Sequence, residues 1–216
     1  MEYRAVIFDL GGVVFPSPFE AFDAYDHGNA LEKGTVRGLI RESSETGAWA
    51  HLERGELTMD EFLAALEAEA RDAGFALDAR RLMGLVGSSL GARPEMTRAI
   101  ENIRARGLRT AALTNNWVVE QRDSSPNGIH EGGLFDVVVE SSVEGLRKPD
   151  PRIYELALAR LDVLASQAIF LDDLGINLKP ARDMGMTTIK VVDPDDAIAQ
   201  LSALLGFDLR EEPKGS

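Results

Sequence analysis

The sequence contains no cysteine, which excludes disulfides, thiolate metal sites and a cysteine nucleophile. Histidine is scarce as well. The three His residues are scattered along the chain and show no metal-ligand spacing. We therefore expect a metal ion to bind through oxygen ligands, which hard cations such as Mg²⁺ prefer.

Basic residues are few in comparison with acidic ones. Lys and Arg number 23 against 36 Asp and Glu, giving a net charge of −13. This balance argues against nucleic acid or an anionic membrane as a partner. It is compatible with a small phosphorylated ligand, because a bound cation can reverse the local field. No apolar run approaches the length of a membrane span, and the N-terminus lacks a secretory leader pattern. We therefore expect a cytoplasmic protein, with its oligomeric state left open.

Strand and helix patterns alternate over much of the 216 residues. Between residues 16 and 90 there is no convincing strand, only helical stretches such as 58–71, where Thr58 and Glu61 match a capping box. The pattern predicts an α/β fold with a Rossmann-like parallel sheet flanked by helices, formed by 1–15 and 91–216. Residues 16–90 are expected to form a small helical cap inserted after the first strand. The expected strands are 3–9, 109–114, 136–141, 168–172 and 187–192, and the helices between and after them include 94–106, 150–161, 177–185 and 194–205.

Polar residues stand at the ends of three expected strands. Asp9 ends the first, Thr114 the second, and Asp172 with Asp173 follows the fourth. Each alone would be an ordinary turn or capping residue. Because the carboxyl ends of parallel strands line one crevice, where ligands bind, their joint placement predicts a functional site. Lys148, directly before a helix, is expected to join them.

The chemistry of this set favours transfer of a phosphoryl group. A carboxylate at the sheet edge can act as a nucleophile. Mg²⁺ can relieve the repulsion among Asp9, Asp172 and Asp173, and a lysine can hold an anionic substrate. A threonine hydroxyl and the N–H groups of a glycine turn, Gly12 among them, can bind phosphoryl oxygens.

Four short motifs occur in a fixed order between residues 9 and 177: FDLGGVV, AALTNN, RKPDP and FLDDLGIN. Together they resemble the haloacid dehalogenase-like hydrolases. The stretches LTNNW, KPDPRIY and HLERGELT are similar to one branch of that family. This branch contains the N-terminal phosphatase domain of soluble epoxide hydrolases and bacterial sugar-phosphate phosphatases.

The resemblance implies a role for each motif. Asp9 would be the nucleophile that forms an aspartyl-phosphate, and Lys148 would steady both nucleophile and phosphate. Thr114 and Asn115 would bind phosphate. The implied Mg²⁺ ligands are Asp9, Asp173 and the carbonyl of Gly11, with Asp172 acting nearby. Asn177 would order the acidic loop, although a plain helix N-cap is an equally good interpretation.

Position 11 departs from the family pattern. Family phosphatases usually carry a second Asp there, which protonates the leaving oxygen, and losing such an acid costs about 10²- to 10⁴-fold in rate.

The most favoured function is hydrolysis of small phosphorylated metabolites. A 2-haloacid dehalogenase-type hydrolase is an alternative, since halide leaves without a proton, as is a weakly active or non-catalytic member that binds a phospholigand or protein. A phospho-receiver domain fits less well, because its acidic pair would follow the first strand.

The cap stretch 47–58 offers further candidates. Trp49 and Leu52 are expected in the core of the cap. His51 and Arg54 are candidates for contacting the leaving group and so for setting substrate specificity.

Overall fold

The computed structural model describes residues 2–43, 45–88, 91–118 and 133–211. The sequence also predicts a short helix after the strand at 109–114, and this prediction falls at 119–132, outside the described residues. Five strands form one parallel sheet in the order β3-β2-β1-β4-β5. This confirms the α/β prediction. Their bounds are β1 Ala5–Phe8, β2 Arg109–Thr114, β3 Val137–Glu140, β4 Ala168–Asp172 and β5 Thr187–Lys190.

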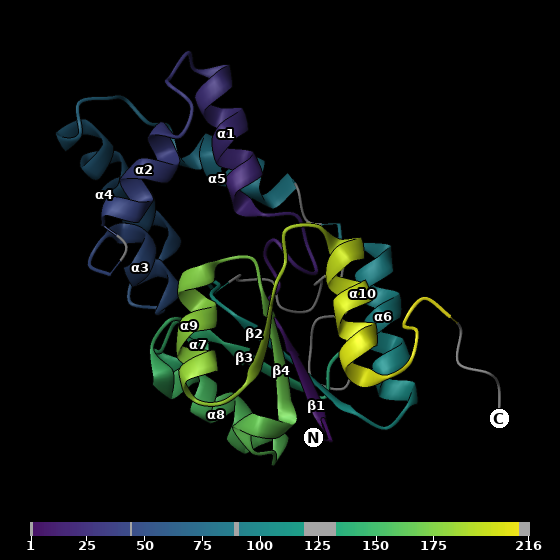
Figure 1. Ribbon diagram of the computed structural model, residues 1–216. Coiled ribbons are helices and arrows are strands. Elements are labelled where there is room, and N and C mark those ends of the chain that lie inside the picture. The colour runs from purple at the N-terminus through teal and green to yellow at the C-terminus, as the bar shows by residue number, and fades with distance from the viewer. Residues whose placement is uncertain (1, 44, 89–90, 119–132, 212–216) are drawn as a thin grey trace.

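Apolar residues of the central strands alternate between two cores, one on each face of the sheet. In β1, Val6 and Phe8 pack into one core, and Ala5 and Ile7 into the other. Helices α6 and α10 cover the first face, and α8 and α9 cover the second (Figure 1). Both faces are thus buried, as a parallel sheet requires. The helices of this part are α6 Pro94–Ala105, α7 Ser141–Glu144, α8 Pro151–Leu161, α9 Gly175–Asp183 and α10 Pro194–Leu205, with a 3₁₀ turn η2 at Ala165–Gln167.

Between β1 and α6, the described residues form five helices, which make up the cap predicted after the first strand (Figure 1). The cap has its own apolar core, in which the Trp49 ring lies edge-on to Phe22 at 5.2 Å and to Phe62 at 5.6 Å between centroids. Trp49 and Leu52 are buried there, as predicted. The cap helices are α1 Pro18–Gly28, α2 Thr35–Glu42, α3 Ala48–Glu53, α4 Met59–Asp72 and α5 Ala79–Ser88.

Local capping signals account for several helix ends. Thr58 and Glu61 form the predicted capping box of α4, and Asp150 caps α8 ahead of Pro151. Helix α9 begins at Gly175, two residues earlier than predicted. The reason is that the Leu174 N–H donates to Asp172 Oδ1, so the turn after β4 closes early.

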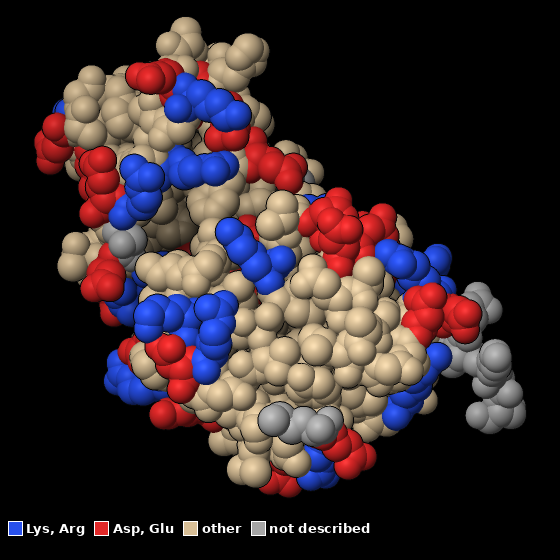
Figure 2. Space-filling view, viewed as in Figure 1, with Lys and Arg blue, Asp and Glu red and all other residues tan. Residues whose placement is uncertain are grey.

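Acidic and basic side chains are interspersed on the face seen in Figure 2, which is hollowed between the cap and the core. Among the helices of the described residues, none combines the length and apolar character needed to cross a membrane.

Candidate functional site

Asp9 lies where β1 gives way to a tight turn. Its N–H donates to the Leu171 carbonyl at 2.9 Å, so the strand ladder continues up to the carboxylate. The Leu10 N–H donates a hydrogen bond to Asp9 Oδ1 at 2.6 Å. Because the Leu10 carbonyl accepts from Val13, Val14 and Phe15, the chain folds over itself directly after the acid. Asp9 is thereby fixed at the carboxyl edge of the sheet and is only 7 % exposed.

The two glycines of this turn have different roles. Gly12 has φ +81°, and a Cβ placed there would lie 2.3 Å from Asp173 Oδ2. Gly11 has no positive φ, and its Cβ would meet Pro18 Cδ at 3.4 Å, an ordinary contact. Only Gly12 is therefore required by the backbone and by the close approach of Asp173.

The expected contact of the Gly12 N–H with phosphate needs correction. This N–H donates to the Phe15 carbonyl at 2.9 Å, so the turn itself uses the donor. Within the part of the chain that the structure describes, the N–H and carbonyl of Gly11 have no hydrogen-bond partner. Gly11 is therefore the better candidate for binding a ligand through its backbone.

Substitution of Gly12 by Ala is expected to destabilise the protein and to displace Asp173. A left-handed φ costs a residue with a side chain about 1–2 kcal/mol, before any clash is counted. Thermal unfolding should show a drop of at least about 3 °C for this chain length. Gly11→Ala is the matched control, since its Cβ has room. Equal melting temperatures for the two variants would contradict this account.

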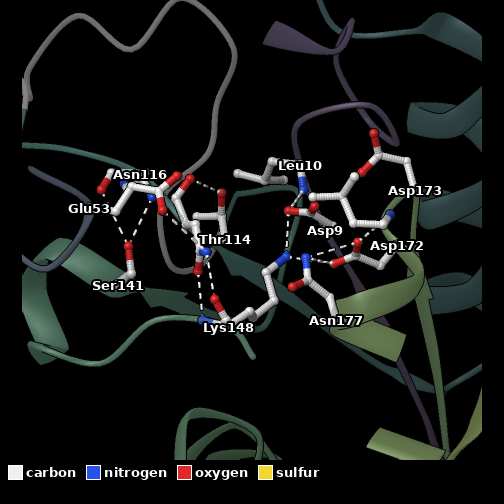
Figure 3. Close-up of polar contacts among 12 residues, drawn as sticks. Asp9, Leu10, Glu53, Thr114, Asn116, Ser141, Lys148, Asp172, Asp173 and Asn177 are labelled. Atoms are coloured by element: carbon white, nitrogen blue, oxygen red, sulfur yellow. Dashed lines mark hydrogen bonds and ion pairs between the residues drawn. The ribbon is translucent and has the colours of Figure 1, made fainter. Parts of the chain in front are cut away.

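Lys148 joins the two strand ends (Figure 3). Its ammonium lies 2.8 Å from Asp9 Oδ1 and 2.8 Å from Asp172 Oδ2, and the side chain is 1 % exposed. Burial by itself would lower the pKa of Lys148, but the charges of Asp172 and Asp9 and their hydrogen bonds raise it above its ordinary value. Lys148 is therefore a fixed positive charge beside the carboxylate of Asp9.

Asp172 is saturated by protein donors. Besides Lys148, Oδ1 accepts from the Leu174 N–H at 2.8 Å, and the Asn177 amide donates to both oxygens at 3.1 Å. Asn177 lies inside α9, whose N-cap position is held by Leu174. Tyr154 in turn donates to the Asn177 carbonyl at 2.7 Å. Asp172 thus orients Lys148 and the loop that carries Asp173, and has little capacity left for a metal ion.

Asp173 completes a cluster of three carboxylates. One oxygen each of Asp9, Asp172 and Asp173 lies within 4.8 Å of the others. The Ser17 hydroxyl makes a long contact of 3.5 Å with Asp173 Oδ2. A backbone hydrogen bond within Asp173 also contacts this carboxylate. Burial and the neighbouring Asp172 raise the pKa of Asp173 to about 6.

The charges of this cluster fit a divalent cation. Burial raises the pKa of Asp9 well above its ordinary value, and although Lys148 opposes this, Asp172 and Asp173 add to it. One lysine thus faces three carboxylates, two of which are held with raised pKa values. A cation bound to oxygen ligands would offset the remaining repulsion. The carboxylates of Asp9 and Asp173 and the Gly11 carbonyl are the oxygen ligands available for such a cation.

Thr114 and Asn115 follow β2 toward the same edge. Thr114 is 4 % exposed, and its hydroxyl makes a long contact of 3.4 Å with the Asn115 carbonyl. The Asn115 side chain makes two hydrogen bonds to the main chain of Lys148. Its Oδ1 accepts from the Lys148 N–H at 2.8 Å, and its Nδ2 donates to the Lys148 carbonyl at 3.0 Å. The side-chain amide is therefore committed to Lys148, and any contact of Asn115 with phosphate would come from its backbone.

His51 and Arg54 are not brought to the carboxylate cluster by any contact among the described residues. Both bind Glu56 within the cap: Arg54 Nε lies 2.7 Å from Oε1, and His51 Nδ1 contacts Oε2. These pairings lower the pKa of Glu56 to about 2, chiefly through the hydrogen bond from Arg54. Their contact with a leaving group stays a prediction.

A different cap residue reaches the core. Glu53 Oε2 lies 2.7 Å from an Arg147 guanidinium nitrogen and 3.4 Å from Asn115 Nδ2. No pattern in the sequence indicates this contact, because Glu53 and Arg147 are 94 residues apart and each is an ordinary charged residue in its own segment.

Comparison with known proteins gives one family. The sequence model of the haloacid dehalogenase-like hydrolases matches residues 3–185. The chain is 43 % identical to mouse acyl-CoA dehydrogenase family member 10 and 32 % identical to pig bifunctional epoxide hydrolase 2, with 96 % and 99 % of the chain covered. It spans only 20 % and 40 % of the length of these relatives.

A relative of similar length is the sesquiterpene phosphatase astK of Aspergillus oryzae, 28 % identical over 94 % of this chain and 97 % of that protein. Among solved structures, a predicted haloacid dehalogenase-like hydrolase from Porphyromonas gingivalis superimposes with a TM-score of 0.67 at 22 % identity. The match covers 98 % of this chain and 100 % of that one. The structural match concerns the fold alone.

Proposed function

Because the chain belongs to the haloacid dehalogenase-like hydrolase family, we propose that it is a Mg²⁺-dependent phosphatase of small phosphorylated metabolites. The observation that carries the proposal is the position of Lys148, whose ammonium is 2.8 Å from both Asp9 and Asp172. A buried cation beside a buried carboxylate at the sheet edge suits a nucleophile that must approach an anionic substrate. A relative named as a phosphatase supports the same reaction class.

Asp9 is proposed to act through Oδ2. The donors that contact its carboxylate in the described part of the chain, Leu10 N–H and Lys148 Nζ, both bind Oδ1. Oδ2 attacks phosphorus, a bond between Asp9 and phosphorus forms, and the ester oxygen departs with its bonding electrons. Water then attacks phosphorus, the bond to Asp9 breaks, and inorganic phosphate is released.

Other side chains hold the transferred group. Lys148 and the Thr114 hydroxyl would bind phosphoryl oxygens, and the backbone N–H of Gly11 would be a further donor. Asp9, Asp173 and the Gly11 carbonyl would hold Mg²⁺, while Asp172 orients Lys148. When bound, Mg²⁺ supplies positive charge that offsets the negative charge of the phosphoryl oxygens.

Gly11 favours a second candidate, a 2-haloacid dehalogenase-type hydrolase, because glycine has no proton to give and halide needs none. A screen of phosphate esters and 2-haloacids, with Mg²⁺ and with EDTA, separates the candidates. Phosphate release that needs Mg²⁺ supports the phosphatase, and halide release that survives EDTA supports the dehalogenase. Binding without either product would identify a non-catalytic member.

For the phosphatase, we expect the rate to depend steeply on the leaving group. Aryl phosphates, which leave as stabilised phenoxides, should be cleaved readily, sugar 1-phosphates less readily, and alkyl phosphates slowly. Gly11→Asp should restore a proton donor, because the site has room for a Cβ and no positive φ. It is expected to speed the poor leaving groups selectively, by up to about 10²-fold.

The measurement is kcat/KM over a series of leaving groups of graded pKa. Gly11→Asn is the matched control, since it adds a side chain of the same size without an acidic proton. A shallow dependence in the wild-type protein would mean that another group already donates the proton, and would contradict this role for Gly11.

A further inference from the structure

Helix α3 of the cap ends against the core. A Cβ at Gly55, directly after α3, would lie 2.4 Å from the carbonyl oxygen of Ser142 in α7, so the two backbones nearly touch. Nearby, the Trp49 ring of α3 lies edge-on to Trp117, which follows β2, at 5.9 Å between centroids. The end of α3 is thus held in a fixed position relative to the loops that follow the strands.

Glu53, the last residue of α3, is buried in this contact and 7 % exposed. Its Oε1 accepts from Trp49 Nε1 at 2.9 Å. Its Oε2 accepts from Arg147 Nε at 2.8 Å and lies 3.4 Å from Asn115 Nδ2. A buried carboxylate is tolerated only when it is paired, and here the partners come from both the cap and the core.

Both core residues that contact Glu53 are directly connected to Lys148. Arg147 precedes it in the chain, and the Asn115 amide bonds to both its N–H and its carbonyl. An Asn side chain can bind this main chain in only one orientation, with Oδ1 toward the N–H and Nδ2 toward the carbonyl. Glu53 favours that orientation. In the flipped orientation the Asn115 side-chain oxygen would face the Glu53 carboxylate and be repelled by it.

We propose that Glu53 is a positioning residue through which the helical cap fixes Lys148, by orienting Asn115 and anchoring Arg147. The inference rests on the proposed function, since it assigns Lys148 a role in the reaction. The cap thereby contributes to the geometry of the catalytic lysine.

Glu53→Gln tests this with a side chain of the same size. Using p-nitrophenyl phosphate and Mg²⁺, we expect kcat to fall roughly 10- to 100-fold, the size typical of a misplaced catalytic group, with KM changed less than about threefold. The matched control is Glu67→Gln, another cap acid, whose Oε1 accepts from the Ala79 N–H within the cap at 3.1 Å. It should leave kcat unchanged.

A double-substitution cycle separates positioning from general loss of structure. Because Glu53 acts partly through Asn115, Glu53→Gln should lower kcat by a smaller factor in an Asn115→Ala background than in the wild-type protein, and the remaining loss reflects the anchoring of Arg147. Multiplicative effects of the two substitutions, or an unchanged kcat in Glu53→Gln, would overturn the inference.

Amide hydrogen exchange at Lys148 gives a readout that does not depend on turnover. This N–H donates to Asn115 Oδ1, so we expect it to exchange about tenfold faster in Glu53→Gln than in wild type or Glu67→Gln. If wild type fails to cleave phosphate esters, the proposed function fails, and exchange alone decides the positioning role. Unchanged exchange would overturn it.

Discussion

Asp9→Asn is expected to lower kcat for p-nitrophenyl phosphate by at least about 10⁴-fold, the scale on which removing a nucleophile acts in covalent catalysis. An amide side chain cannot form the aspartyl-phosphate intermediate. Trapping with beryllium fluoride should place the ligand on Asp9 in the wild-type protein and should fail in the variant. Near-normal turnover by Asp9→Asn would reject covalent catalysis from this residue.

The same substitution should leave the fold intact. Burial raises the pKa of Asp9, which means that its negative charge is disfavoured there, and Lys148 keeps Asp172 as a partner at 2.8 Å. We therefore expect a melting temperature within about 3 °C of wild type. Asp26→Asn is the matched control. Asp26 is another buried acid, but it accepts from the Gly34 and Val36 N–H groups inside the cap. The Asp26→Asn substitution should lower the stability of the protein and change kcat by less than about twofold.

Removal of Mg²⁺ is expected to abolish phosphate release, and Asp173→Asn should lower kcat/KM by about 10³-fold, since a metal ion supplies several kcal/mol of charge stabilisation. Among the three acids of the cluster, Asp173 is the one without a strong protein partner in the described residues, so it has the most capacity to bind a cation. Calorimetry should show Mg²⁺ binding to wild type and much weaker binding to Asp173→Asn.

Asp183→Asn serves as the control for this prediction. Asp183 ends α9, is 61 % exposed and pairs with Lys179 on the surface, so its loss should affect neither Mg²⁺ binding nor turnover. Full phosphatase activity in excess EDTA would contradict a role for the metal. Halide release that persists under those conditions would point to the dehalogenase-type reaction instead.

The sequence alone determined the sheet and its covering helices. Buried strands read as continuous apolar runs, and helices carry local signals such as Thr58 with Glu61 or Asp150 before Pro151. These signals act within a few residues of one another, so one chain displays them without an alignment. The rule that parallel strands end at one edge was enough to predict that Asp9 and Asp172 would meet.

The sequence did not show how the polar side chains divide their bonds. The residues alone show Asp172 and Asp173 only as an acidic pair, and the family resemblance made Asp173 the direct metal ligand with Asp172 nearby. The structure shows the difference in contacts: Asp172 is saturated by Lys148, Asn177 and a backbone N–H, while Asp173 is nearly free of such partners. It expected the Gly12 N–H to bind phosphate, but that donor closes the turn. In both cases, neighbouring residues of the same chemical type differ in which hydrogen bonds their side chains or backbone groups make.

The tertiary structure alone decided the contact between cap and core. Glu53 and Arg147 are 94 residues apart, and each is an unremarkable charge in its own segment. Their pairing depends on how the cap sits on the sheet, which is fixed by close packing such as that of Gly55 on Ser142. Chemistry at strand ends follows from local pattern and topology, whereas a contact between two parts with their own apolar cores follows from their packing, which no local pattern encodes.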